Sequence, residues 1–532
     1  MSRPEVVILG GGLAGLTLAL QLRQRLPALD ILVLERQRHP VPAATHKVGE
    51  SSVEIGAHYF SHVLGLTEHL ATRQLKKFGF RFFFCDGRRD LDQVLELGAS
   101  RYLATPAYQL DRGIFENYLG ERARACGVRF LDGACIAGLA LGSGGSAHAV
   151  DYEHAGRVQR LQARWVVDAS GRAGLLKRHL GLAQGNAHDA NSVWFRIGTR
   201  IDVNDWSANA AWRARCDPPD RWLSTNHLVG EGYWVWLIPL ASGSHSVGIV
   251  ADARLHPLKS MNTFDKALAW LHRHQPRLAE ELEGRRAALQ DFCFLRRFSY
   301  GCKQVFSASR WALTGEAGMF LDPFYSPGSD FIAIGNTYIT ELIARDLAGE
   351  PLEAYAHVYE QLFQSFYRST LTLYLDQYAM FGDPEVLPVK VLWDYTYYWG
   401  VLCQLFFQRR LTDVPMLGRI RGELAATLDL NETMQRLLRA WSAVSAKRNA
   451  AVMIDQAALG WFAELNRGLT DRLDDAGFEA RMRANGAQLR TLAAEILARA
   501  SADHPGLDTA AVRALCGASC AGAAPLLFAA AA

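Results

Sequence analysis

The stretch from Val6 to Arg36 constrains the fold of this chain more than any other. The apolar run at residues 6–9 leads into the glycine-rich sequence GGGLAG at 10–15, and an apolar helical pattern follows. A second apolar run at 31–34 ends on Glu35, twenty residues after the last glycine of the motif. Strand, glycine turn, helix, strand and acid in this order are typical of a βαβ unit that binds a dinucleotide.

Each part of this unit has a physical task. Gly10 permits the tight turn, Gly12 lets the backbone approach a pyrophosphate, and Gly15 lets helix and strand pack closely. The helix N-terminus offers free N–H groups and a partial positive charge to the phosphates. A tight turn without a ligand would leave the acid at the strand end unexplained. The residues predicted to bind the cofactor here are Gly10, Gly12, Leu13, Ala14, Gly15, Glu35 and Arg36.

Two later junctions repeat this pattern. The apolar run at 165–167 ends in Asp168, followed by Ala-Ser-Gly, and the run at 311–314 leads into Gly315, Glu316, Ala317 and Gly318. Asp322 and Pro323 follow, and a helix is expected from 329 to 347. Complete strand–glycine–helix junctions so far apart in the chain predict one long cofactor that bridges them, FAD rather than NAD. The first junction would bind the pyrophosphate, and the second the ribityl chain and the flavin.

The chain is too long for one simple core, so several structural regions are expected. The predicted fold class is mixed α/β (α+β), a GR2-type FAD-binding Rossmann domain with an inserted antiparallel substrate-side sheet and a helical C-terminal region. Residues 1–185 would form the first part of the FAD-binding domain, with the Lys77 strand, and 186–300 the β-rich region. Residues 301–348 would form its second part, with the flavin loop, and 349–532 the helical substrate-lining region.

Composition excludes several classes of protein. The net charge is only +3 and no long basic run occurs, so we expect no nucleic-acid partner. The apolar stretch 391–407 carries Asp394 and is short for a membrane span, so a buried or substrate-lining helix is expected without stable membrane insertion. The nine cysteines form no CxxC pair, and no metal site is predicted. The first apolar run is the Rossmann strand itself, so a cytoplasmic location is expected.

Two further patterns suggest a substrate side. The alternating, aromatic stretch 75–84 is predicted as a strand, and two adjacent lysines, Lys76 and Lys77, enter it. Trp234 and Trp236 alternate within a β-rich segment, so both side chains should point to one face. A solvated strand end and ordinary sheet packing are the structural alternatives for these two patterns.

Together these residues resemble the FAD-dependent monooxygenases of the p-hydroxybenzoate hydroxylase fold, over roughly residues 5 to 345. The sequence W-x-W-x-I-P at 234–239 and K-x-G at 77–79 narrow the resemblance to the flavin-dependent halogenase (tryptophan-halogenase-like) branch. Gly49-Glu50-Ser51 resembles the loop that communicates between flavin and lysine there. The further cofactor-binding residues implied are Gly49, Ser51, Arg112, Asp168, Gly315, Glu316, Asp322 and Gly328. The substrate or tunnel residues implied are Trp234, Trp236, Pro239, Tyr325 and Ser326.

The resemblance implies a division of labour. Reduced FAD, supplied by a separate flavin reductase, reacts with dioxygen to give a flavin C4a-hydroperoxide, and chloride or bromide attacks it. The hypohalous acid then travels to Lys77, the catalytic residue, which presents electrophilic halogen to an electron-rich aromatic or conjugated substrate. That substrate would be a free small molecule or one tethered to a carrier protein.

Three residues depart from the family pattern. Pro327 precedes Gly328 where a residue with an N–H group helps to bind halide, and proline has no N–H. Tyr325 stands where tryptophan halogenases carry a glutamate, which argues against tryptophan as substrate, and Glu316 replaces the usual aspartate. Two alternatives therefore stay open: a halide-independent FAD monooxygenase or dehydrogenase, and a non-catalytic flavoprotein or carrier-protein-binding module.

Overall fold

The computed structural model describes residues 3–43, 48–85, 87–88, 90–516 and 525–528. They form two compact units, each assembled from segments that are distant in sequence. The first unit comprises Met1–Gln74, Leu110–Ala187 and Ser299–Arg368. The second comprises Leu75–Gln109, His188–Phe298 and Ser369–Ala532. The four-region division predicted from the sequence stays a prediction. The Lys77 segment, which the sequence places in the FAD-binding region, lies in the second unit.

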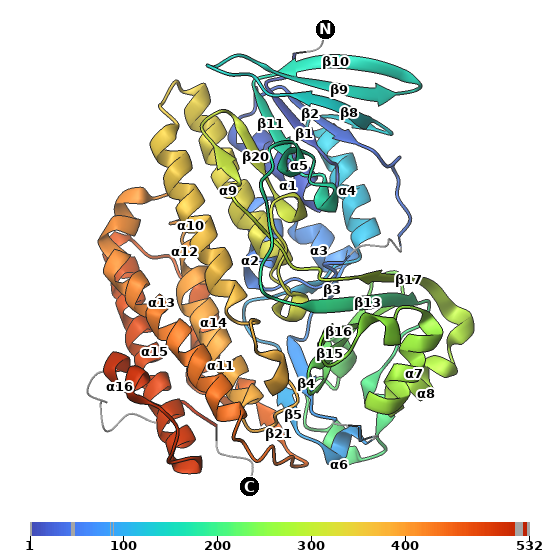
Figure 1. Ribbon diagram of the computed structural model, residues 1–532, viewed down its shortest axis with the longest axis vertical. Coiled ribbons are helices and arrows are strands. Elements are labelled where there is room, and N and C mark those ends of the chain that lie inside the picture. Colours follow the sequence, from blue (N-terminus) through green and yellow to red (C-terminus); the bar gives the residue numbers. More distant parts are fainter. Residues whose placement is uncertain (1–2, 44–47, 86, 89, 517–524, 529–532) are drawn as a thin grey trace. The chain divides into compact units, whose positions relative to one another are not determined.

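The first unit is built on a six-stranded sheet with the strand order β19-β20-β11-β1-β2-β7, parallel except for the β19–β20 pair (Figure 1). Its central strands are wholly buried, which is why they are short apolar runs without alternation. The strands are β1 (Val6–Leu9), β2 (Ile31–Glu35), β7 (Arg129–Asp132), β11 (Trp165–Asp168), β19 (Phe306–Ser307) and β20 (Trp311–Leu313). The predicted Rossmann unit is confirmed.

Helices cover this sheet, and α1 contacts both α4 and α9. The helices of the first unit are α1 (Leu13–Arg25), α2 (Glu54–His58), α3 (Thr67–Arg73), α4 (Arg112–Ala125), α5 (Leu175–His179) and α9 (Gly328–Leu347). Smaller sheets are formed by β8 (Cys135–Ala140), β9 (His148–His154) and β10 (Arg157–Ala163), and by β12 (Ala183–Gln184) and β18 (Gly301–Cys302). The chain passes from the first unit to the second within α10 (Glu353–Leu371).

Asp346, near the end of α9, ties that helix to the sheet. Its carboxylate accepts hydrogen bonds from Arg164 Nε at 2.7 Å, Trp165 Nε1 at 2.8 Å and Arg310 Nε at 3.0 Å. Burial alone would raise the pKa of Asp346, but these three donors lower it below its ordinary value. The carboxylate therefore stays ionised and links α9 to the starts of β11 and β20.

The second unit is built on an eight-stranded, mainly antiparallel sheet, order β17-β13-β16-β15-β14-β4-β5-β21. Only the β14–β4 and β5–β21 pairs are parallel among its described strands. The strands are β4 (Phe80–Phe83), β5 (Glu96–Gly98), β13 (Ala190–Ile197), β14 (Thr225–Gly230), β15 (Tyr233–Pro239), β16 (His245–Asp252), β17 (Leu289–Leu295) and β21 (Met453–Asp455). One face packs into an apolar core with α7 (Phe264–His274) and α8 (Pro276–Glu283). The predicted inserted antiparallel sheet is confirmed.

The aromatic stretch predicted as one strand is two strands. β3 (Leu75–Lys76) pairs with β6 (Tyr108–Gln109), whereas β4 joins the large sheet. Gly79 separates them with φ +72°, a left-handed conformation that interrupts a regular strand. β4 then pairs with β14 and β5, which is why the Lys77 segment belongs to the second unit.

The C-terminal region is helical, as predicted, and α11, α13 and α15 lie side by side (Figure 1). The remaining helices are α6 (Ala210–Arg213), α11 (Leu387–Tyr397), α12 (Gln404–Phe407), α13 (Val414–Ser442), α14 (Gly460–Arg467), α15 (Asp475–Asp503) and α16 (Ala510–Cys516). The apolar stretch 391–407 is broken by a π-helical turn at Tyr398–Cys403. Among the described helices, none has the length and apolar character that a membrane crossing requires.

Candidate active site

The glycine turn after β1 is crowded, and at Gly10 and Gly15 a side chain would meet backbone atoms. Gly10 has φ +115°, and a Cβ placed on it would lie 2.3 Å from Ala169 O. A Cβ on Gly15 would lie 2.0 Å from Gly10 O. Gly12 differs: within the described chain, the nearest atom to a Cβ there is Glu116 Oε1 at 4.0 Å. Gly10 and Gly15 therefore serve the fold, whereas Gly12 leaves open space in front of α1.

That space suits a pyrophosphate. α1 begins after Gly12 with no acidic residue in its first turn, and no described side chain caps it. The first N–H groups of a helix have no partner within the helix and carry a partial positive charge. The N–H donors of α1, its positive potential and the open space at Gly12 therefore lie together where the sequence predicts that the phosphates bind.

Glu35 stands beside this turn. Its Oε2 accepts a hydrogen bond from Gly11 N at 2.6 Å, and Oε1 accepts one from Gln37 N at 2.7 Å. Each carboxylate oxygen has a second lone pair, so both can still accept from a ribose hydroxyl. Arg36 is exposed next to it.

The second predicted junction meets the first at the start of α1. Gly315, which opens the turn after β20, has φ +60°, and a Cβ on it would lie 2.9 Å from Ala14 Cβ. Asn336 of α9 makes hydrogen bonds to both junctions. Its Nδ2 donates to Ala14 O and Thr17 Oγ1, and its Oδ1 accepts from Thr314 Oγ1 at 2.7 Å. The two junctions thus form one continuous site, as a long cofactor requires.

Three predicted acids lie at a strand end or in turns near these junctions. Asp168 accepts from Ser170 N at 2.9 Å and Leu176 N at 2.7 Å, and burial raises its pKa. Asp322 accepts from Phe324 N at 3.0 Å and is fully buried. Glu316 lies 3.4 Å from Arg172 Nε. The contacts of Asp168 and Asp322 stabilise their own turns, so a direct role at the cofactor stays a prediction for all three.

The Gly49–Ser51 loop is held against α4. Arg112, the first residue of α4, donates from Nη1 to Val48 O at 2.7 Å and pairs with Glu116. A Cβ on Gly49 would lie 2.9 Å from Arg112 Nη1, so glycine is needed for this contact. Glu50 O accepts from Leu110 N. Arg112 therefore shapes the loop whose contact with the cofactor is predicted.

The loop before α9 has an unusual backbone. Ser326 has φ +53°, a left-handed conformation rare for a serine, and follows the short turn Pro323–Tyr325. Pro327 occupies the cap position of α9, and its carbonyl accepts from Phe331 N. Among the described residues, no atom lies within 4 Å of a Cβ built on Gly328. Asp330, one turn further, accepts from Gly56 N at 2.8 Å and so joins α2 to α9.

Lys77 and its neighbour point in different directions. Lys76 is exposed, with Nζ 4.6 Å from the centre of the Tyr102 ring, whereas Lys77 is 3% exposed. Lys77 Nζ lies 3.3 Å from the centre of the Phe80 ring. This contact between an ammonium group and an aromatic face holds the amine in a desolvated setting. The structural alternative, a solvated strand end, therefore fits the exposed Lys76 but not the buried Lys77.

Aromatic rings continue from Phe80 across the sheet face opposite α7 and α8. His227 lies 5.3 Å from the Phe80 ring and stacks on Phe82 at 4.7 Å. Trp234 lies 5.1 Å from His227. The Tyr395 ring of α11 lies 6.2 Å from Phe80, so the C-terminal helices contribute to the surroundings of Lys77.

The tryptophan motif lies on that same face. Trp234 and Trp236 are buried with ring centres 5.6 Å apart, so the predicted common face is confirmed. Trp234 Nε1 donates to Tyr378 OH at 3.0 Å, and Trp236 Nε1 donates to Ser246 Oγ at 3.1 Å. Pro239 ends β15 opposite His245. Trp234 therefore also anchors the C-terminal region to the sheet.

The predicted site residues divide between the two units. The cofactor residues, with Tyr325 and Ser326, lie in the first unit; Lys77, Trp234, Trp236 and Pro239 lie in the second. Two residues were not predicted from the sequence: Asn336, a polar residue directly after the apolar run 331–335, and Arg81, a charge among phenylalanines. Within the described chain, no group of three or more His, Cys, Asp or Glu could hold a metal ion.

Comparison with known families decides the assignment. The profile of the tryptophan halogenase family matches residues 97–376, more than half of the chain. The chain belongs to this family. A second profile, described as an NAD(P)-binding Rossmann-like domain, matches residues 8–73. The protein is therefore an enzyme of the flavin-dependent halogenase type, with FAD as its cofactor.

Similar proteins support the assignment. The chain is 25% identical over 475 residues to flavin-dependent halogenase chlA of Dictyostelium discoideum, covering 80% of this chain and 76% of that protein. It is 27% identical over 345 residues to a 1H-pyrrole-2-carbonyl-(peptidyl-carrier protein) chlorinase of Pseudomonas fluorescens, covering 61% and 72%. Halogenase PltM in complex with phloroglucinol and FAD has the same fold, with TM-score 0.64, 16% identity and 96% and 98% coverage.

Proposed function

We propose that this member of the family transfers electrophilic halogen to an electron-rich aromatic or conjugated substrate, with Lys77 as the catalytic relay. Bound FAD in its reduced form supplies the activation of dioxygen by which chloride or bromide is oxidised to hypohalous acid. The observation that carries the proposal is the burial of Lys77 with its amine against the Phe80 ring. The aromatic contacts from Phe80 to His227 and from His227 to Trp234, on the same sheet face, support it.

Lys77 can perform this task because of its donors and its surroundings. An ammonium group has three N–H donors, and the ring of Phe80 occupies one side of it. An N–H group of this amine can donate to the oxygen of hypohalous acid and so orient the halogen. Aromatic neighbours limit the water near the amine, which favours transfer to a substrate carbon over loss to solvent. The carbon gains the halogen and releases its proton as the oxygen leaves as water.

The proposed substrate class is based on a residue that departs from the family pattern, Tyr325, and on a relative of the chain. Tyr325 in place of a glutamate removes the base that an indole substrate uses in tryptophan halogenases, so we propose a phenol, a pyrrole or a similar ring. The Pseudomonas relative is named for a pyrrole carried on a peptidyl-carrier protein. We include carrier-bound substrates in the proposal, and a flavin reductase as the source of reduced FAD.

The test compares two neighbouring lysines. Purified protein with FAD, a flavin reductase, NADH and bromide is given phenols, pyrroles and indoles, free and carrier-bound, and products are identified by mass. Lys77→Ala should lower brominated product by at least about a hundredfold while peroxide formation from NADH continues. Lys76→Ala is the matched control, because its side chain is exposed, and it should keep bromination. Bromination that persists in Lys77→Ala would refute the relay.

A second function is favoured by Pro327. Its position at the cap of α9 removes one N–H group from the place where the family binds halide. Direct oxygen transfer or dehydrogenation would then replace halogenation. That function requires product in halide-free buffer, with a gain of one oxygen or a loss of two hydrogens. A strict requirement for added halide rules it out.

A further inference from the structure

We infer that Glu96, shared between Arg81 and Arg221, is a positioning residue for Lys77. It acts by fixing the backbone of the K-x-G segment, residues 77–79, from the reverse face of the sheet. The inference rests on the proposed role of Lys77, and it adds residues that neither the motifs nor the family resemblance point to.

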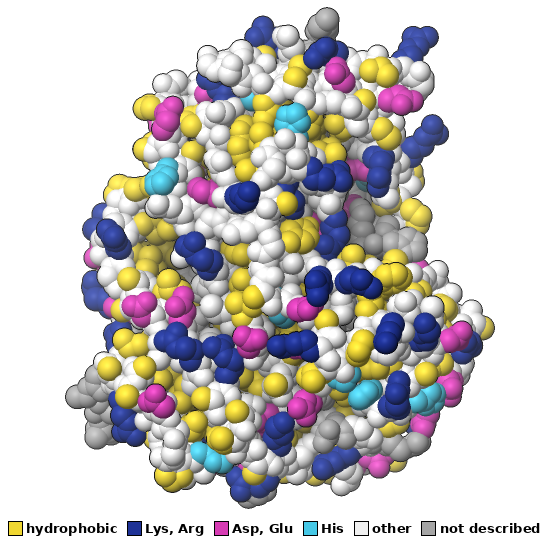
Figure 2. All heavy atoms as spheres, in the orientation of Figure 1, with side chains coloured by type: hydrophobic (Ala, Val, Ile, Leu, Met, Phe, Trp, Pro, Cys, Tyr) yellow, Lys and Arg dark blue, Asp and Glu magenta, His cyan; other side chains and the backbone are white. Residues whose placement is uncertain are grey.

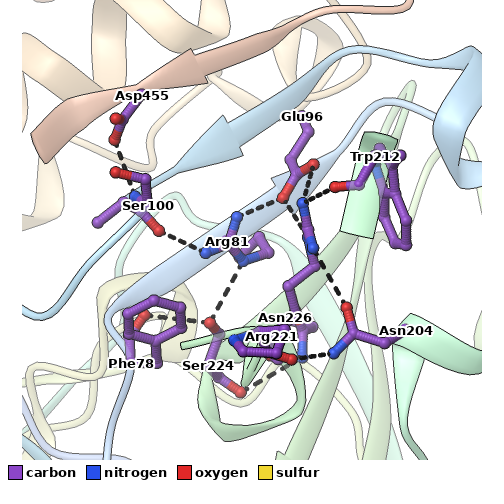
Figure 3. A network of polar contacts seen from close by, with 12 residues as sticks. Phe78, Arg81, Glu96, Ser100, Asn204, Trp212, Arg221, Ser224, Asn226 and Asp455 are labelled. Atoms are coloured by element: carbon purple, nitrogen blue, oxygen red, sulfur yellow. Dashed lines mark hydrogen bonds and ion pairs between the residues drawn. The ribbon is translucent and has the colours of Figure 1, made fainter. Parts of the chain in front are cut away.

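The three side chains form one buried ion cluster (Figure 3). Arg221 binds Glu96 with two donors, Nε to Oε1 at 2.8 Å and Nη2 to Oε2 at 3.3 Å. Arg81 pairs with the same Oε1 through Nη1. All three residues are 0% exposed. The cluster joins β4 and β5, which are close in sequence, to the turn Arg221–Leu223, which is far from both.

The electrostatics make Glu96 the central member. Burial alone would raise the pKa of Glu96, but Arg81 and Arg221 lower it below its ordinary value, so the carboxylate stays ionised. Without that carboxylate, two guanidinium groups would face each other in a desolvated interior, which is strongly destabilising locally. The arginines would then have to move apart, together with the backbone that they contact.

That backbone is the K-x-G segment. Arg81 Nε donates to Ser224 Oγ at 3.4 Å, and Ser224 Oγ donates to Phe78 O at 3.1 Å (Figure 3). Phe78 N donates to Leu223 O at 3.0 Å, two residues after Arg221. Both backbone groups of Phe78 are thus bonded to the turn that the ion cluster holds.

The segment needs such support because of Gly79. This glycine has φ +72°, and in the described part of the chain no atom lies within 4 Å of a Cβ built on it, so side-chain packing does not hold it in place. Its carbonyl accepts from Thr225 N at 3.0 Å, again beside Ser224. Lys77 N itself donates to Ala107 O at 2.9 Å, on the side of β6. The cluster and the turn therefore fix the backbone on the C-terminal side of Lys77, and through it help to set the position of the amine over Phe80.

The experiment separates positioning from general stability. Glu96→Gln removes the charge, and Ser224→Ala removes the bond to Phe78 O while leaving all three ions. Asp291→Asn is the matched control: Asp291 pairs with buried Arg196 at 2.6 Å in the same sheet, between β13 and β17. Each variant, fully loaded with FAD, is compared for melting temperature and for halogenated product per NADH oxidised.

We expect product per NADH to fall at least about fivefold in Glu96→Gln and about threefold in Ser224→Ala. NADH oxidation and trapped hypohalous acid should continue in both variants. Asp291→Asn should lower the melting temperature and keep the yield. If Glu96→Gln does not fold, Ser224→Ala decides.

Two outcomes separate this inference from the proposed function. Loss of product in Lys77→Ala, together with control-like yields in Glu96→Gln and Ser224→Ala, would overturn the positioning role alone. Retained product in Lys77→Ala would overturn the proposed function and the positioning role with it.

Discussion

Replacing Gly12 with alanine should weaken FAD binding without unfolding the protein. The backbone at Gly12 (φ −81°, ψ −168°) is accessible to alanine, and the nearest described atom to the new methyl group would be 4.0 Å away. The cost to the fold is therefore that of a poorer helix cap, about 0.5 kcal/mol. The methyl group would, however, occupy the space through which the pyrophosphate reaches the N–H groups of α1. We expect at least a tenfold increase in the Kd for FAD, equivalent to about 1.4 kcal/mol.

Gly15→Ala provides the contrast. Its Cβ would lie 2.0 Å from Gly10 O, where an ordinary contact needs about 3.4 Å, so α1 and the end of β1 would have to separate by more than 1 Å. The new Cβ and Gly10 O are both fixed to the backbone, so neither can move away by a side-chain rotation. We therefore expect a loss of about 3 kcal/mol in the free energy of unfolding. Fluorescence titration of the apoprotein gives Kd, and denaturant unfolding gives stability. If Gly12→Ala bound FAD as tightly as the parent, the phosphates would not pass Gly12 and the assignment of this turn would be wrong.

Three further predictions concern contacts in the described chain. Asp346→Asn should lower the free energy of unfolding by about 2 kcal/mol at pH 7. Because the folded-state pKa of Asp346 is lowered, its contribution to stability is present above the unfolded-state pKa near 3.8 and is lost as pH falls through the folded-state pKa. The unfolding curves of parent and variant should therefore converge in acid. Trp234→Phe should remove the hydrogen bond to Tyr378 and cost about 1 kcal/mol, measured by urea unfolding, while FAD affinity stays unchanged. Asn336→Leu should weaken FAD binding and thermal stability together, since Asn336 joins both glycine junctions; a change in only one of them would contradict that reasoning.

Surface charge agrees with the expectation from composition. Figure 2 shows Lys and Arg side chains interspersed with Asp, Glu and apolar side chains over the face in view. With a net charge of only +3, a substrate or partner protein has to be recognised by local features of the surface rather than by a uniform field.

The fold around the predicted cofactor site was largely predictable because its determinants are local. Gly10, Gly12 and Gly15 act within six residues, and their spacing alone encodes the turn, the open space and the close packing. Glu35 follows at the end of the next strand, and its contact with Gly11 N is set by the parallel pairing of β1 and β2. Asn336 was not predicted, because its four partners come from α1, the end of β20 and the segment after α2, which only the folded chain brings together.

The catalytic side was harder to predict because its determinants are distant in sequence. The alternation of side chains along a strand implied that Lys76 and Lys77 face opposite ways, but it did not show which of them is buried. Which lysine is buried depends on where Gly79 interrupts the strand and on which sheet β4 joins. Contacts beside Lys77 run from Phe78 to Ser224 and from Arg81 to Glu96. A motif of three residues can therefore mark the position of the proposed relay lysine, while the positioning of its amine, as we infer it, involves charged residues outside the motif. Substitutions at those residues should change how efficiently halogen is transferred before they change whether flavin is oxidised.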